Sequence, residues 1–127
     1  MDILTVLNEE ITAHGIPYQF MEWNSEDGVL RYPYAVGELT RTPTANEDGN
    51  FESTLLITVT TRGTWAELYE IDSIIEAHFP SSGGLNVSTE KGACIIFYAG
   101  SFPVPTGEAD LKRIQINLDI KEWKGLD

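Results

Sequence analysis

The chain has 127 residues, a length that normally builds one domain around one hydrophobic core. It carries 20 acidic and 8 basic residues, a net charge of -12, which argues against a general nucleic-acid binder because such proteins need Lys and Arg against phosphates. Hydrophobic residues make up 42% of the chain, too many for a disordered protein, and the single Cys94 excludes an internal disulfide and a cysteine-based zinc site.

The sequence predicts no membrane span and no signal peptide. No apolar run approaches the roughly 20 residues of a membrane span, and the first residues lack the basic stretch of a secretory signal. We therefore expect an unprocessed chain made in the cytoplasm. The acidic excess has two interpretations: solubility through self-repulsion, or a surface that meets a basic partner or repels passing DNA.

The first third of the chain predicts a helix followed by two strands. Apolar residues at helical spacing predict a helix over residues 2–14. Residues 17–23 and then 30–40 show strand character. Pro33 marks the start or the edge of the second strand, because proline cannot donate to a ladder.

A long hairpin follows. Residues 41–50 have no apolar periodicity and predict an exposed loop at its tip. Residues 52–61 alternate as a half-buried strand. Three residues are expected to share its buried face: Leu55, Ile57 and Val59.

The second helix has the best-defined start. The segment Thr64-Trp65-Ala66-Glu67 fits a capping box, in which the Thr64 hydroxyl accepts from the Glu67 amide and the Glu67 carboxylate reaches back. Pro80 and the Ser and Gly residues after it end the helix. An apolar stripe predicts its buried face: Leu68, Ile71, Ile75 and Phe79.

The last third predicts three more strands: a short one over 85–89, a central one over 93–98, and the longest alternation over 111–123. Two prolines within residues 101–107 predict a rigid loop. The fold class is therefore α+β, in the order helix, three strands, helix, three strands. We expect a mostly antiparallel, twisted sheet of about six strands with both helices on one face, and residues 1–127 as a single domain.

Residues that carry enzyme chemistry do not converge in the sequence. His14 and His78 each end a predicted helix, where positive charge favours the helix dipole, and neither has a second ligand at metal spacing. Cys94 lies in an apolar strand, which predicts a buried, inert thiol. We expect no enzyme, no metal and no cofactor. The aromatic residues near helix and strand ends are expected to be core or interface anchors: Trp23, Trp65, Trp123, Tyr32, Tyr34 and Tyr69.

One arrangement resembles a known family. A short helix leads to Tyr32-Pro33-Tyr34-Ala35-Val36-Gly37-Glu38-Leu39, then to a polar loop and a Thr-rich strand. A helix that begins near Trp65 and a final β segment complete the order. Over roughly residues 2–123, this order and spacing resemble the phage tail-terminator or tail-completion proteins, also called head-to-tail joining or minor tail proteins.

The resemblance implies a structural protein that assembles as a homo-oligomeric ring, commonly of six chains, at the head-proximal end of a tail. Such rings stop tube growth and join tail to head, so the expected partners are further copies, tail-tube proteins and head-connector proteins. The implied location is the virion tail after synthesis in the host cytoplasm, with no membrane and no cofactor. DNA would pass a negative lumen without specific binding.

The resemblance also gives two loops a role in contacts between subunits or with the tube. An edge strand could in addition pair with a neighbour and extend the sheet around the ring. The candidate contact residues are Arg41, Thr42, Glu47, Asp48, Phe102, Pro103 and Pro105.

Two other functions stay open. The charge fits equally well an acidic immunity or inhibitor-type protein that covers a basic partner, which predicts a stable monomer. A small enzyme would need a convergent cluster of perturbed groups in a pocket, for which the sequence gives no signal.

Overall fold

The computed structural model describes residues 3–21, 28, 31–43, 50–89 and 92–124. The elements run in the order α1 (Ile3–Thr12), β1 (Tyr18–Phe20), β2 (Tyr34–Pro43), β3 (Asn50–Thr61), α2 (Trp65–His78), β4 (Leu85–Thr89), β5 (Gly92–Val104) and β6 (Lys112–Lys124). The fold is α+β, with two helices and six strands, in the element order that the sequence predicts.

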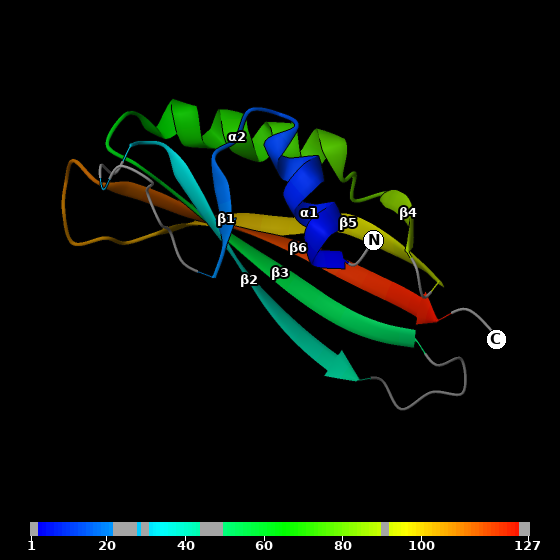
Figure 1. Ribbon diagram of the computed structural model, residues 1–127. Helices are drawn as coiled ribbons and strands as arrows, with labels where there is room; N and C mark the ends of the chain where they lie inside the picture. Colours follow the sequence, from blue (N-terminus) through cyan, green and yellow to red (C-terminus); the bar gives the residue numbers. More distant parts are fainter. Residues whose placement is uncertain (1–2, 22–27, 29–30, 44–49, 90–91, 125–127) are drawn as a thin grey trace.

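The six strands form one mixed sheet in the order β1-β2-β3-β6-β5-β4. β1 pairs parallel with β2, and every other neighbouring pair is antiparallel. The sheet is therefore not purely antiparallel, because the chain crosses over between β1 and β2 and returns in the same direction. Figure 1 shows the sheet strongly twisted and curled into a half-barrel, with α2 lying along it.

The core lies between the helices and one face of the sheet. The expected alternation is confirmed, since Leu55, Ile57 and Val59 are fully buried. Alternate residues of β6 are buried on the same face, which packs against side chains from both helices. Burial of each such side chain stabilises the fold by about 1.5–3 kcal/mol. The helix residues of this core are Val6, Leu7, Ile11, Leu68, Ile71 and Ile75.

The start of α2 confirms half of the predicted capping box. The Thr64 side chain accepts a hydrogen bond of 3.2 Å from the Glu67 amide. The Glu67 carboxylate accepts from the Thr61 hydroxyl at 2.7 Å, so it ties the helix to the end of β3. At the other end, the Phe79 carbonyl accepts from the Tyr98 amide at 2.8 Å, which joins α2 to β5.

Two predicted boundaries in the first half are wrong. The strand expected over 17–23 is three residues long, because Met21 takes a positive φ of 71° and leaves the extended region. The loop expected over 41–50 is shorter, because the ladder between β2 and β3 continues to the pair Pro43↔Phe51. Arg41 and Thr42 are therefore strand residues, opposite Ser53 and Glu52. Residues 44–49 lie outside the described part of the chain.

The rigid loop expected over 101–107 is also partly wrong. Phe102 and Pro103 belong to β5, which pairs with β6 as far as Val104. The strand tolerates a proline because β4 pairs with β5 only up to Ile96, so the missing N–H falls on an uncovered edge. Over residues 92–96, in contrast, β5 lies between β4 and β6, as expected for the central strand predicted over 93–98.

Candidate functional site

The structure does not bring the two predicted contact regions together. Arg41 and Thr42 lie near the end of β2 that pairs with the start of β3. Phe102, Pro103 and Pro105 lie at the other end of the sheet. There the end of β5 and the end of β3 flank the same residue of β6, since Val104 and Thr60 both pair with Arg113. Glu47 and Asp48 fall outside the described residues. The second region therefore supplies the candidate site.

A pocket of about 450 Å³ lies between the start of α2 and the connection from β5 to β6. Trp65 forms one wall, and Pro103 and Pro105 belong to the opposite strand and connection. The remaining lining residues are Val104, Thr106, Gly107, Glu108, Ala109, Leu111 and Lys112. The walls are mainly apolar and the polar groups few, as in many protein binding sites.

Trp65, which lines this pocket, belongs to an exposed aromatic pair on α2. Trp65 and Tyr69 lie one helical turn apart on α2, with ring centroids 6.4 Å apart. They are 41% and 43% exposed. Phe102 on β5 is 46% exposed but does not line the pocket, because it pairs with Gln115 on the face of the sheet away from the helices. Exposed aromatic residues that gather on one surface mark an interface. The sequence predicted that aromatic residues near helix and strand ends are core or interface anchors, but it did not show which of them are exposed.

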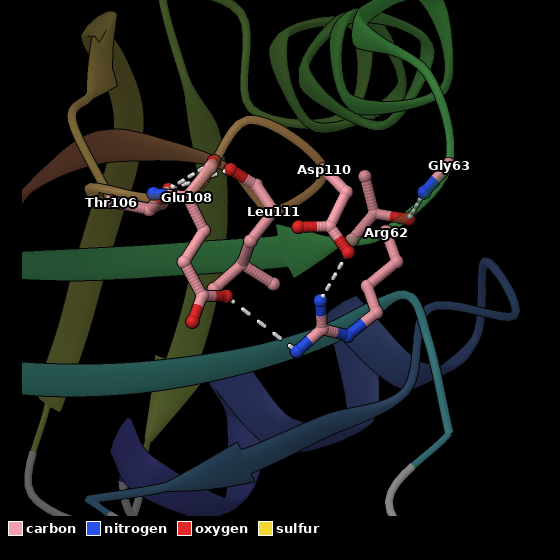
Figure 2. Close-up of polar contacts among 7 residues, drawn as sticks. Arg62, Gly63, Thr106, Glu108, Asp110 and Leu111 are labelled. Atoms are coloured by element: carbon pink, nitrogen blue, oxygen red, sulfur yellow. Dashed lines mark hydrogen bonds and ion pairs between the residues drawn. The ribbon is translucent and has the colours of Figure 1, made fainter.

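The connection that forms the pocket is held in place by Arg62, as Figure 2 shows. The Arg62 Nη1 lies 2.7 Å from Asp110 Oδ2, and Nη2 lies 3.7 Å from Glu108 Oε2. The Thr106 hydroxyl donates to the Leu111 carbonyl at 2.7 Å. These contacts fix the loop before any partner binds, so less conformational entropy is lost on binding.

Arg62 also reaches back to the residues before β2. Its guanidinium carbon lies 5.4 Å from the centroid of the Tyr32 ring, which in turn lies 5.6 Å from the Tyr34 ring. Hydrogen bonds to Tyr32 and Asp110, together with the negative charge of Asp110, raise the pKa of Arg62. The guanidinium is thus a permanent cation that joins the β2 start to the β5–β6 connection.

A second cluster joins the ends of the two helices, and the sequence analysis did not foresee it. The His14 Nε2 lies 2.8 Å from the His78 Nδ1. The His78 Nε2 makes a hydrogen bond to the Glu10 carboxylate, and its ring packs edge-on against Phe79. The sequence places each histidine at the end of a predicted helix. Only the packing of α1 beside α2 brings the two rings together.

A third polar cluster holds α2 to the bulge in β5. The buried Asp72 carboxylate accepts from the Tyr98 hydroxyl at 2.9 Å and from the Ser101 hydroxyl at 3.1 Å. The register shift between Tyr98 and Gly100 lets both hydroxyls face the helix. All three groups satisfy one another, as a structural cluster requires.

Cys94 is buried, as predicted. Burial and the charge of Glu122 raise the pKa of its thiol, which keeps it protonated and unreactive. Within residues 3–21, 31–43, 50–89 and 92–124, no cluster of three or more His, Cys, Asp or Glu side chains is arranged to hold a metal ion. Neither helix that the structure describes is long and apolar enough to cross a membrane.

The comparisons with known proteins assign no family. No protein-family model matches this sequence, and no curated protein matches it either.

Proposed function

We propose that this protein is a structural component of a phage or prophage tail. It forms a homo-oligomeric ring at the head-proximal end, ends growth of the tail tube and joins tail to head. It acts through surfaces and not through catalysis, needs no cofactor, and resides in the virion after synthesis in the host cytoplasm. The support from the sequence is the resemblance over residues 2–123.

The observation that carries the proposal is the open sheet. β1 pairs with β2 only as far as Gly37, and β4 pairs with β5 only as far as Ile96. Within the described residues, no strand covers the outer edge of β2 or of β5 beyond those points. A ring of identical chains needs two different surfaces that fit each other, and uncovered strand edges are ready to pair with another chain.

The charge supports the same proposal. Among the described residues the exposed carboxylates outnumber the exposed cations, and they are spread over both helices and the sheet. A channel lined by such groups repels the phosphates of DNA, so the genome passes without binding. The exposed acidic residues are Glu9, Glu38, Glu52, Glu70, Glu76, Glu108 and Asp110.

The test is electron microscopy of the purified protein, alone and mixed with tail tubes from the phage or prophage whose genes neighbour its own. The proposal predicts closed rings with a central channel and tubes capped at one end. Tubes that stay uncapped and continue to lengthen in the presence of tube protein would overturn it.

One observation favours a second candidate, the acidic inhibitor-type protein. Glu70 and Glu76 are exposed on α2, next to the aromatic pair Trp65 and Tyr69. An acidic, aromatic helix face fits a basic enzyme surface by charge complementarity. This candidate predicts a monomer that forms a one-to-one complex with a basic protein.

A further inference from the structure

We infer that neighbouring copies join head to tail, with the Phe20–Met21 edge of one copy seated in the Trp65 pocket of the next. This contact deepens the ring proposed above and rests on it. The Phe20–Met21 edge is the end of β1, and the Trp65 pocket is the pocket between α2 and the β5–β6 connection.

Four of the five exposed large hydrophobic side chains of the described residues form two groups, and Phe102 belongs to neither. Phe20 and Met21 end β1, at 36% and 58% exposed. Trp65 lines the Trp65 pocket, and Tyr69 lies beside it on α2. β1 lies at one edge of the sheet, and β2 and β3 stand between it and the β5–β6 pair that bears the pocket (Figure 1). Two distinct apolar surfaces on one chain are what a heterologous contact requires, whereas a two-fold dimer would use one surface twice.

Met21 is held outward by its backbone. Its φ of 71° lies in the left-handed region, which an L-residue seldom adopts, and its amide donates to the Gly37 carbonyl at 2.8 Å. Such conformations persist where the surrounding structure imposes them, and they cluster at clamps and binding sites. Here the strand edge presents an unbranched thioether to solvent.

The Trp65 pocket suits this side chain. At about 450 Å³ it has room for the thioether of Met21 beside Trp65, and sulfur next to an aromatic ring is a favourable contact. Pro103, Pro105 and the Arg62–Asp110 ion pair hold its walls in position. A preformed pocket that receives one exposed anchor is typical of the centre of an interface.

The two surfaces carry one pair of opposite charges, because the other charged residue in the pocket lining, Glu108, is paired with Arg62. Glu38 is exposed on β2, next to Gly37, whose carbonyl holds Met21. Lys112 lines the Trp65 pocket. In the contact that we infer, the Glu38 carboxylate of one copy pairs with the Lys112 ammonium of the next. This pair fixes the orientation of the contact between two copies that otherwise repel each other through their net charge of -12.

The test uses two variants that each destroy one surface. Met21→Asp places a charge on the edge, and aspartate tolerates a positive φ. Trp65→Asp places a charge in the pocket, and an acidic residue suits the first turn of a helix, so both variants should fold. Ala77→Asp adds the same charge to an exposed position of α2 outside both surfaces and is the matched control.

Analytical ultracentrifugation of each protein, and of a one-to-one mixture, reads the assembly. We expect each single variant to weaken self-association by about tenfold or more, because it removes a buried anchor. The mixture should form a one-to-one dimer, since the Met21 of the Trp65→Asp chain still fits the intact pocket of the other chain. Ala77→Asp should assemble like the unmodified protein.

Several outcomes would overturn the contact: single variants that assemble normally, or a mixture in which no dimer forms although the unmodified protein assembles. Open filaments, with a dimer in the mixture, would keep the contact and overturn the ring. A chain that stays monomeric at every concentration would overturn both. As a second test, Glu38→Lys and Lys112→Glu should each weaken assembly, and the two together in one chain should restore it.

Discussion

The ring of Tyr18 on β1 lies against Gly37 on β2, so closely that only a hydrogen atom fits between them. A Cβ at Gly37 would stand 2.8 Å from both Cε2 and Cζ of Tyr18, and nearer still to the phenolic oxygen. Tyr18 is 6% exposed and belongs to the core. This close approach seats the short parallel strand β1 on β2 and thereby sets where Met21 leaves the sheet.

Gly37→Ala should therefore destabilise the protein by about 1–3 kcal/mol, because overpacking forces Tyr18 or β1 to move. Urea unfolding followed by tryptophan fluorescence measures the loss. Adding Tyr18→Phe should recover part of it, since the phenolic oxygen is the nearest atom. If Gly37→Ala were as stable as the unmodified protein, the packing of β1 would differ from that described.

The same tyrosine predicts a loss of stability in alkali. Burial raises the pKa of Tyr18 from 10.0 to about 12. Between these values the folded state binds more protons than the unfolded chain, so stability falls as the pH rises from about 10 towards 12. The total loss is on the order of 2–3 kcal/mol. Stability measured against pH should show this fall, and Tyr18→Phe should lack it; an equal fall in both proteins would contradict the assignment.

Asp72→Ala should cost about 1–3 kcal/mol, because it leaves the partly buried Tyr98 and Ser101 hydroxyls without their shared acceptor. Glu76→Ala on the same helix is the control; this side chain is exposed, so its loss should change stability by less than about 0.5 kcal/mol. Thermal unfolding followed by circular dichroism compares them. Equal effects of the two substitutions would show that Asp72 does not hold α2 to β5.

Arg62→Ala should loosen the β5–β6 connection with little loss of global stability. The ion pairs to Asp110 and Glu108 are exposed, and exposed pairs contribute little to global stability. Hydrogen exchange should rise in residues 106–111 while the amides of β3 stay protected. Arg62→Lys keeps the charge but loses the guanidinium fork, so it should restore only part of the protection. Unchanged exchange in the alanine variant would remove Arg62 from this role.

His78→Ala should destabilise the protein more than His14→Ala. His78 contacts both His14 and Glu10, whereas the His14 ring is at the end of this chain of contacts. A net hydrogen bond contributes about 1 kcal/mol, so the expected losses are about 2 and about 1 kcal/mol. Denaturant titrations at neutral pH measure both. A larger loss for His14→Ala would reverse the order of contacts described.

Periodicity predicted the parts of the fold that follow local rules. Leu55, Ile57 and Val59 alternate at strand spacing and are buried, and the Thr64 cap needs only four consecutive residues. These signals lie within one element, so the sequence contains them completely. The element order could be read in the same way.

Features that depend on distant residues could not be read. The parallel pairing of β1 with β2 brings Tyr18 against Gly37, and the packing of the two helices brings His14 to His78. Pro103 signalled a loop, but its place on an uncovered edge allows a strand. The pocket needs the same kind of information, because Trp65 and the β5–β6 connection meet only in the folded sheet.

The central claim is that this chain assembles into a closed ring. Light scattering after size exclusion, over a range of concentrations, measures the native mass directly. The account predicts a species of defined mass near six chains that loses subunits on dilution and is absent in Met21→Asp. A strict monomer over the whole range would contradict the ring and favour the acidic inhibitor-type protein.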